Sequence, residues 1–138
     1  MWILKSLLED YRSFALIVPS FIDNKAKQRE FLRALYDDEG CVALRIFRKT
    51  GEIKRNLTLS SNSLKFIEEI KIILERSFSI QSNKISRYVK KWNNKEFVNY
   101  VLSITGKDNF EKFQEHIGFT HPDKTKKLYS MIHSYKRK

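Results

Sequence analysis

Apolar residues recur at spacings of three and four near the start of the chain, which is the period of an amphipathic helix. This pattern predicts a helix within residues 1–18 that stops near Pro19, because proline disrupts a helix interior. Asp23 and Asn24 are good N-caps for a second helix over residues 25–38, and Gly40 is placed to end it. We expect residues 1–22 to form a helical lead-in and residues 23–138 to form the main domain.

From residue 41 the period changes to the alternation that is typical of β-strands. Residues 41–61 contain two alternating runs on either side of the turn-forming segment 49–52, which predicts a β-hairpin. A second hairpin is expected over residues 84–104, because Asn93 and Asn94 tolerate the positive φ angles of a tight turn. Alternation directs the apolar side chains of the first hairpin towards a core, namely Val42, Leu44, Ile46, Leu57 and Leu59.

Helical patterns separate and follow the two hairpins. Residues 63–76 form the clearest amphipathic helix, with apolar residues at a period near that of the α-helix. Two more helices are expected, one around residues 107–117 that Gly118 closes and one that begins at Pro122. The sequence therefore predicts an α+β fold of order αββαββα with an extra N-terminal helix, in which helices back an antiparallel four-stranded sheet. One face of that sheet is expected to stay open.

The net charge of the chain indicates the kind of partner that it binds. Lys and Arg outnumber Asp and Glu by 27 to 16, which gives a net charge of +11. Such a charge attracts polyanions, so nucleic acid is the expected partner, and an anionic membrane surface is a weaker alternative. Cys41 is the only cysteine, which excludes an intrachain disulfide and favours a reducing, cytoplasmic location. We expect neither a signal peptide nor a membrane span, because the apolar runs are short and interrupted.

The open sheet face is expected to carry basic, hydrogen-bonding and aromatic side chains, because these alternate with the apolar ones. A two-stranded ribbon of this kind can read base edges in the major groove while lysine and arginine hold phosphates. The predicted DNA-binding residues are Arg45, Lys49, Lys54, Asn56, Thr58, Lys84, Ser86, Tyr88, Lys90 and Asn99. An ordinary polar sheet exterior would look similar, and Arg87 falls on the core side of the alternation.

The run FLRALYDDEG at residues 31–40 carries a short motif at the end of the second predicted helix. Its apolar, small and acidic positions are Leu32, Ala34, Leu35, Asp37, Glu39 and Gly40. With this motif in an αββαββα order, the sequence from about residue 19 to residue 130 resembles the LAGLIDADG homing-endonuclease family in its single-motif form.

The resemblance implies site-specific hydrolysis of double-stranded DNA by two motif helices that cross and bring their terminal carboxylates together. Carried over to this sequence, Glu39 and the Gly40 carbonyl would hold Mg²⁺ or Mn²⁺, and Lys124 is the nearest candidate for the active-site lysine. Carboxylate and carbonyl oxygens are hard ligands that suit Mg²⁺. The implied contact with the second motif helix consists of Leu32, Ala34, Leu35 and Asp38.

Residues 37–39 leave two interpretations open. Three carboxylates oppose the macrodipole at the end of a helix unless a cation compensates them, which favours a metal site over a simple solvated turn. In a symmetric dimer Asp38 would face its own copy, which costs stability unless a proton or a cation is bound there. His121, close to Lys124, is an alternative candidate for the active site.

Two classes of function agree with these residues. The first is a metal-dependent DNA endonuclease that acts as a homodimer, because the chain carries one motif and two are needed. The second is a non-cleaving nucleic-acid binder of the same fold, such as an intron maturase or a transcription regulator. The chain could also be one half of a two-motif enzyme, and an intron, intein or free-standing origin is left open.

Overall fold

The computed structural model describes residues 18–136, so the helix predicted within residues 1–18 falls almost wholly outside the described residues. The described part contains the α-helices α2 (Lys25–Glu39), α3 (Leu64–Phe78), α4 (Lys107–His116) and α5 (Pro122–His133). Its strands are β1 (Cys41–Ile46), β2 (Ile53–Ser61), β3 (Ser86–Trp92) and β4 (Lys95–Ile104). A short 3-10 helix, η1 (Ser134–Lys136), follows α5. The predicted α+β order from residue 23 onward is confirmed.

Local side-chain chemistry explains where several of these elements begin and end. The Asn24 side chain accepts a hydrogen bond from the Lys27 N–H at 2.9 Å, and Ser63 caps α3 in the same way. In the second hairpin Asn93 and Asn94 have φ angles of 50° and 62°. The prediction that these two asparagines form a tight turn is therefore confirmed.

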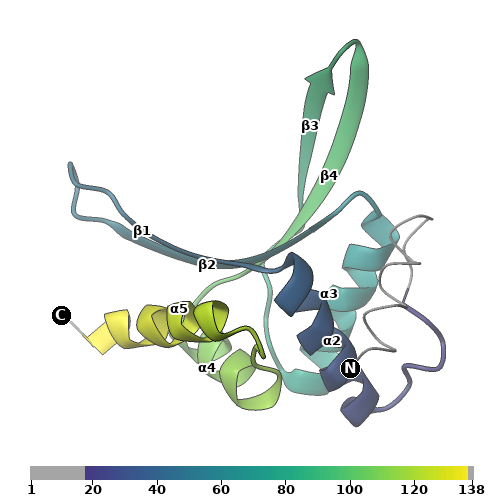
Figure 1. The fold of residues 1–138 in the computed structure, drawn as a ribbon, viewed down its shortest axis with the longest axis horizontal. Coiled ribbons are helices and arrows are strands. Elements are labelled where there is room, and N and C mark those ends of the chain that lie inside the picture. Colours follow the sequence, from purple (N-terminus) through teal and green to yellow (C-terminus); the bar gives the residue numbers. More distant parts are fainter. Residues whose placement is uncertain (1–17, 137–138) are drawn as a thin grey trace.

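The four strands form one antiparallel sheet in the order β1-β2-β4-β3 (Figure 1). Each hairpin pairs within itself, and the pairing of β2 with β4 joins the two hairpins at the centre of the sheet. All the described helices lie against one side of this sheet, and the sheet curves away from them so that its other side is concave (Figure 1). The expected open face is therefore present.

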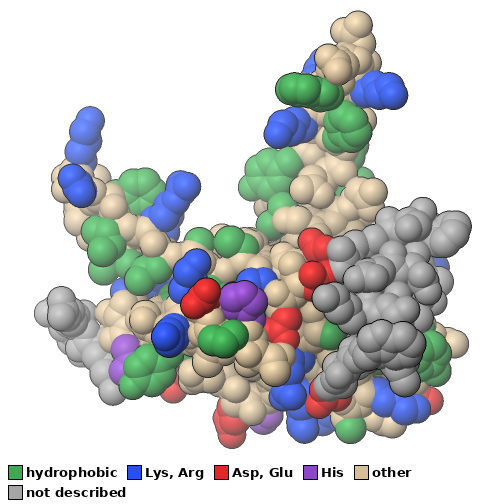
Figure 2. Space-filling view, in the orientation of Figure 1, with side chains coloured by type: hydrophobic (Ala, Val, Ile, Leu, Met, Phe, Trp, Pro, Cys, Tyr) green, Lys and Arg blue, Asp and Glu red, His purple; other side chains and the backbone are tan. Residues whose placement is uncertain are grey.

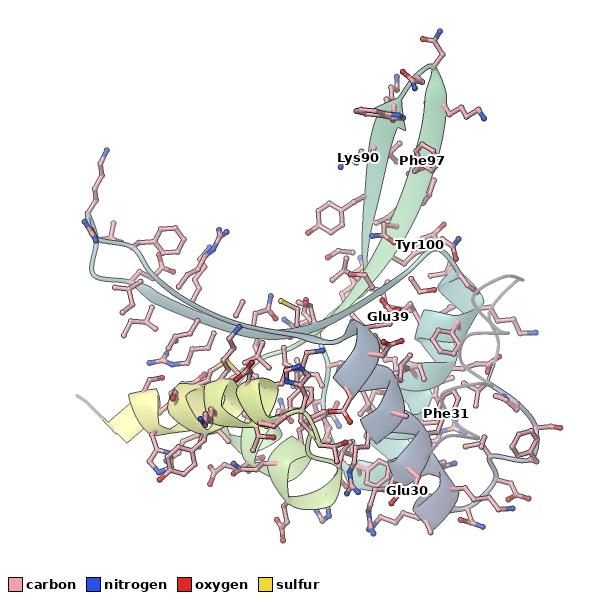
Figure 3. All side chains as sticks on the ribbon, viewed as in Figure 1. Glu30, Phe31, Glu39, Lys90, Phe97 and Tyr100 are labelled. Carbon is pink, nitrogen blue, oxygen red and sulfur yellow. The ribbon has the colours of Figure 1, made fainter. Side chains whose placement is uncertain are left out.

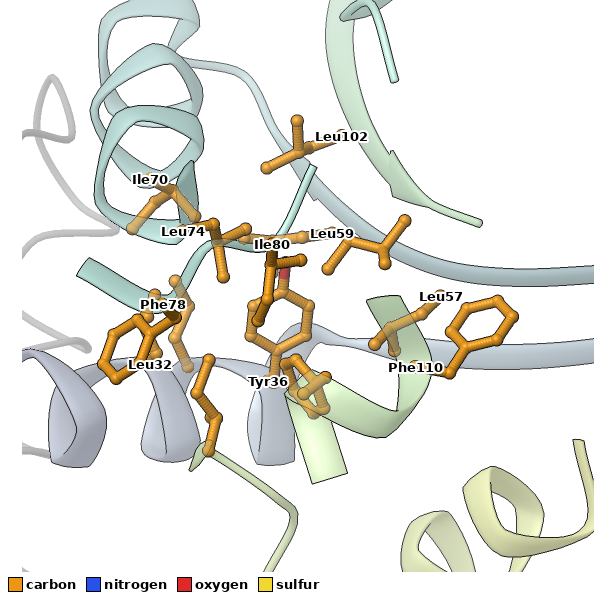
Figure 4. Close-up of a cluster of buried hydrophobic side chains, with 14 of the residues drawn as sticks. Leu32, Tyr36, Leu57, Leu59, Ile70, Leu74, Phe78, Ile80, Leu102 and Phe110 are labelled. Carbon is orange, nitrogen blue, oxygen red and sulfur yellow. The ribbon is translucent and has the colours of Figure 1, made fainter. Parts of the chain in front are cut away.

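The hydrophobic core lies between the centre of the sheet and the helices (Figure 4). Its side chains come from both central strands and from every described α-helix, and they include Leu32, Leu57, Leu59, Ile70, Leu74, Leu102, Phe110 and Leu128. Tyr36 is also fully buried, and its hydroxyl has no hydrogen-bond partner among residues 18–136. Burial raises the pKa of the Tyr36 phenol far above its usual range.

Both hairpins extend beyond this core, which corrects two predictions. Leu44 and Ile46 lie on the helix side of β1, as alternation requires. They are nevertheless 41 % and 65 % exposed, because the hairpin extends past the helices that would cover it.

The second hairpin differs from the prediction at its start. Strand β3 begins at Ser86, so Lys84 lies before the strand and not within it. Arg87, which conflicted with a buried face, is simply exposed, because most of β3 lies outside the core.

The base of the first hairpin is anchored to the end of the chain by Arg55. Its Nε donates to Ser134 Oγ at 2.6 Å, and its guanidinium lies 3.9 Å from the centre of the Tyr135 ring. These contacts tie β2 to η1 on the helix side of the sheet. They fix the direction in which the hairpin leaves the core.

Candidate nucleic-acid interface

The strand register places most of the predicted DNA-binding residues on one side of the sheet. Arg45 pairs with Lys54 across β1 and β2, and Tyr88 pairs with Asn99 across β3 and β4. Directly paired residues in an antiparallel sheet point to the same side. The side turned away from the helices, called here the open face, carries Arg45, Lys54, Asn56, Thr58, Ser86, Tyr88, Lys90 and Asn99. Their role in binding DNA stays a prediction.

The open face has two walls of different chemistry above a floor of small side chains. One wall is the β1–β2 hairpin, where Arg45 and Lys54 lie on the open face and Lys49 lies in the turn. The floor is made by the pairs of β2 and β4, such as Thr58 with Ser103. Figure 2 shows blue basic side chains on both hairpins and a wide hollow between them. A polyanion lying in this hollow would meet lysine and arginine from both walls.

The second wall is the β3–β4 hairpin, and it also carries aromatic residues that were not among the predicted DNA-binding residues. Phe97 is the register partner of Lys90, and Trp92 is the partner of Lys95, so both aromatic rings share the open face. Figure 3 labels Phe97 and Lys90 on this hairpin. The alternation that selects Tyr88 and Asn99 also selects these two positions. Phe47 lies beyond β1, and the Lys54 Nζ lies 5.4 Å from the centre of its ring.

The motif helix α2 ends directly beside this sheet. Its last residue, Glu39, is exposed, and Gly40 leads straight into β1 (Figure 3). A carboxylate at this position adds charge to the negative end of the helix dipole. Glu39 is therefore placed where a cation would be stabilised by the helix end and by its own carboxylate.

Gly40 is required by a close approach and not by its backbone angles. Its φ of −73° is open to any residue, and its N–H donates to the Tyr36 carbonyl at 2.9 Å. A Cβ at this position would lie 2.6 Å from the Tyr36 carbonyl oxygen and 2.8 Å from the Tyr36 ring. Only glycine lets the helix pass into the strand this tightly.

Two charged side chains join the end of α2 to the residues at the start of α5. Lys124 donates from Nζ to the carbonyl oxygens of Tyr36 and Asp37 at 3.1 and 2.6 Å, which places a cation at the end of α2. The Asp37 carboxylate accepts hydrogen bonds from the N–H groups of Thr120 and His121 at 2.8 and 3.1 Å, and from the Thr120 hydroxyl. We call this arrangement the reciprocal cap.

The reciprocal cap gives structural roles to residues that the sequence suggests for catalysis. Lys124 lies near Glu39, as an active-site lysine would, but its Nζ is bonded to main-chain carbonyls. Partial burial lowers the pKa of Lys124, and the negative charges of Asp37 and Glu39 act in the opposite direction. His121 is the N-cap of α5, where its ring accepts a hydrogen bond from the Lys124 N–H. A catalytic role for either residue stays a prediction.

Replacing Asp37 with alanine should lower the free energy of unfolding by about 1–2 kcal/mol, because the N–H groups of Thr120 and His121, just before α5, lose their charged acceptor. Thermal or urea unfolding measures this difference. The matched control is Asp123→Ala, in the first turn of the same helix, which should cost at most about 0.5–1 kcal/mol. Equal losses in the two variants would mean that the reciprocal cap contributes nothing beyond general charge.

Burial divides the four residues of the predicted contact between two motif helices, and the contact itself stays a prediction. Leu32 and Leu35 are 0 % and 5 % exposed, because both pack in the core of their own chain. Such side chains have no surface left for a second copy. Of the predicted set, only the half-exposed Ala34 and the exposed Asp38 remain accessible on α2.

The described residues do not build a complete metal site within one chain. Among residues 18–136, no group of three or more His, Cys, Asp or Glu side chains could hold a metal ion. Mg²⁺ commonly keeps several waters and uses one or two carboxylates together with substrate phosphates. Glu39 and the Gly40 carbonyl fit such a shared site, and they do not fit a closed site made by this chain alone.

In the part of the chain that the structure describes, no helix has the length and apolar character needed to cross a membrane. The cytoplasmic location expected from the sequence stays a prediction.

The chain is similar in sequence to parts of two much longer proteins. Two curated proteins of Methanocaldococcus jannaschii match the chain. A glutamine–fructose-6-phosphate aminotransferase (isomerizing) is 34 % identical over 107 residues, which are 77 % of this chain and 9 % of that protein. A replication factor C small subunit is 33 % identical over 115 residues, which are 83 % of this chain and 6 % of that protein. The chain thus spans less than a tenth of either relative.

A family model described as a LAGLIDADG-like domain matches residues 26–118. The matched segment runs from the first turn of α2, through both hairpins and α3, to the residues that close α4. It contains Glu39, Gly40 and the whole open face. Because this match covers more than half of the sequence and agrees with the observed order of elements, the chain belongs to the LAGLIDADG-like domain family.

Proposed function

We propose that this chain is the DNA-binding and DNA-cleaving module of a homing endonuclease, acting on double-stranded DNA with Mg²⁺ or Mn²⁺. The observation that carries the proposal is the placement of a basic, concave sheet face directly beside the acidic end of the motif helix. The first feature is suited to holding a duplex and the second to hydrolysing its backbone. Membership of a family whose members are usually nucleases supports this combination.

The two relatives support the proposal that this chain is a mobile module. They do not support assigning to it either of the activities in their names. One is named as an aminotransferase and the other as a replication factor, yet each matches the chain over less than a tenth of its length. A segment common to two proteins of unrelated names is best explained as an insert that both carry. We infer an intein-like or intron-like origin for the module, since spread into unrelated hosts is expected for a homing endonuclease.

The chain's residues would contribute positioning and charge to phosphodiester hydrolysis. In this reaction water adds to phosphorus, the P–O bond to the leaving strand breaks, and the leaving oxygen takes up a proton. Glu39 and the Gly40 carbonyl would hold a divalent cation, which when bound stabilises the charge of the phosphate and acidifies a water. The reciprocal cap would hold the end of α2 in place, and lysines on both hairpins would fix the strand.

A complete cleavage site would need a second motif helix. One chain supplies one Glu39, whereas cutting both strands of a duplex needs two reactive centres. The accessible Ala34 and Asp38 on α2 would face the second copy, or a different motif-bearing half. The mass of the protein on DNA distinguishes a homodimer from a single chain.

Lys54→Ala should weaken binding to duplex DNA and flatten its dependence on salt. Loss of one phosphate contact lowers the slope of log K against log salt by about 0.9–1. The matched control is Lys107→Ala, because Lys107 is exposed at the start of α4 in the helix layer and should leave the slope unchanged. If both variants keep the wild-type slope, Lys54 is not part of the DNA interface.

A second function, nucleic-acid binding without cleavage, uses the same open face. It is favoured by the hydrogen bonds of the Lys124 ammonium to main-chain carbonyls, which engage the candidate active-site lysine. A maturase-like or regulatory chain would bind with the same salt dependence but would leave every strand intact. The presence of metal-dependent strand cutting decides between the two functions.

A further inference from the structure

The hairpin of β3 and β4 exposes three large aromatic side chains. Tyr88, Trp92 and Phe97 are 59 %, 66 % and 53 % exposed. All three share the open face, as the pairs Tyr88 with Asn99, Lys90 with Phe97 and Trp92 with Lys95 require. Exposed aromatic rings gathered in one place are unusual for a soluble surface, and they mark a site of interaction.

The rings form a zigzag row along the ribbon, with basic side chains between them. Phe97 on β4 lies diagonally across from both Tyr88 and Trp92 on β3, so the row passes from one strand to the other and back. Lys90 stands between Tyr88 and Trp92 on the same strand and the same face, and Lys95 is paired with Trp92. Figure 3 shows Lys90 and Phe97 side by side on the projecting hairpin.

The charge of this hairpin identifies the class of partner. Residues 86–97 carry Arg87, Lys90, Lys91 and Lys95 against the single acid Glu96. A polyanion is therefore attracted to the hairpin. The exposed faces of the aromatic rings are matched by a partner that also has flat, uncharged surfaces. Nucleic acid offers both, with phosphates for the cations and bases for the rings.

The other hairpin lacks this feature, which makes the two walls of the open face unequal. Its basic residues are Arg45, Arg48, Lys49, Lys54 and Arg55, of which Arg55 is bound to Ser134 on the helix side. Its only exposed aromatic ring is Phe47, and the Lys54 ammonium already lies over that ring. The β1–β2 hairpin therefore suits phosphate contacts, whereas the β3–β4 hairpin suits contacts with bases.

We propose that Tyr88, Phe97 and Trp92 stack on unpaired bases, so that the chain prefers nucleic acid with a locally unpaired strand to a continuous duplex. In a continuous duplex the flat faces of the bases are stacked on one another, and only their edges reach the grooves. The Phe97 ring has no hydrogen-bonding group, so on the edges in a duplex it could contact only a thymine methyl, whereas it could cover the exposed face of any unpaired base. This inference rests on the proposed nucleic-acid binding and adds the conformation of the strand that is bound.

The test compares binding to a short duplex of arbitrary sequence with binding to the same duplex containing a run of unpaired thymines. One unpaired position carries 2-aminopurine, whose fluorescence falls when it stacks on an aromatic ring. Phe97→Leu and Trp92→Leu remove rings but keep apolar side chains on the strands. Val89→Ala is the matched control, because Val89 is 44 % exposed on the opposite side of β3. Unchanged thermal unfolding confirms that each variant keeps the fold.

Stacking is worth about 1–3 kcal/mol per base, which corresponds to a roughly 5- to 150-fold change in affinity. We expect the wild type to bind the unpaired site more tightly than the duplex by a factor in this range and to quench 2-aminopurine. Phe97→Leu and Trp92→Leu should each reduce the preference and the quenching, while Val89→Ala should keep both.

The outcomes separate this inference from the proposed function. Equal affinity of the wild type for both probes, with normal salt-dependent duplex binding, overturns the stacking inference and leaves the proposed function standing. Failure to bind either probe overturns the proposed function itself. If the ring variants change the mass of the free protein but not its affinity for the probes, the aromatic row is a protein contact and the inference is overturned.

Discussion

Glu39→Gln should abolish metal-dependent cleavage of DNA while leaving DNA binding within about twofold of the wild type. The substitution keeps the size of the side chain and removes the charge that would hold the cation at the end of α2. Loss of metal-assisted stabilisation of the transition state is worth several kcal/mol, so cleavage should fall by at least about 1,000-fold. The rate of strand cutting under single-turnover conditions measures this effect.

The matched control for this experiment is Glu30→Gln on the same helix. Glu30 lies far from the sheet end of α2 and forms an ion pair with Arg33 at 3.4 Å (Figure 3). Its loss should leave the cleavage rate unchanged, because this partly buried pair lies far from Glu39 on the same helix. Cleavage that survives in Glu39→Gln would remove Glu39 from the metal site and would require another ligand.

Gly40→Ala should lower the free energy of unfolding by about 1–3 kcal/mol, which is the usual cost of forcing extra atoms into a packed region. The new methyl would lie 2.6 Å from the Tyr36 carbonyl oxygen, and that oxygen belongs to the backbone of the motif helix, so it cannot simply rotate away. Relief requires the end of α2 to move relative to β1. Urea unfolding measures the loss, and a shifted Glu39 should slow cleavage as well.

Gly51→Ala separates crowding from backbone strain. Gly51 has a φ of +71°, and nothing lies within 4 Å of the position of its Cβ, so alanine there meets strain but no neighbour. The expected loss is about 1 kcal/mol or less. A Gly40→Ala variant no less stable than Gly51→Ala would contradict the close approach at the junction of α2 and β1.

The elements of the fold could be predicted because each carries its own local pattern. The apolar period of α3, the cap Asn24, and the tight turn at Asn93 and Asn94 are all properties of neighbouring residues. Alternation also assigned the residues of the open face correctly within the strands, because a strand has only two sides, whereas Lys84 lies before β3.

The extent of burial could not be predicted in the same way. Alternation shows which side of β1 faces the helices, but it does not show where the helices stop, so Leu44 and Ile46 looked like core residues. The apolar stripe of α2 was equally ambiguous. Leu32 and Leu35 could face either their own core or a second copy, and the choice depends on tertiary packing.

The reciprocal cap could not be predicted from local sequence patterns, because its partners lie far apart in the sequence. Asp37 and its partners Thr120 and His121 are separated by more than 80 positions, as are Lys124 and the carbonyls it binds. Sequence patterns marked Asp37 as a motif acid and Lys124 as a candidate lysine. They could not show that the two side chains exchange caps between α2 and α5, because that contact exists only once both helices have packed.

The central claim is that the open face holds duplex DNA and that the end of α2 cuts it. Its most direct test is incubation of the protein with a randomised duplex library, with Mg²⁺ or with a chelator, followed by sequencing of the newly formed ends. We predict cuts that need Mg²⁺ and fall within a shared sequence. Tight, salt-sensitive binding without any metal-dependent cut would contradict the endonuclease and would identify the chain as a non-cleaving binder of the same family.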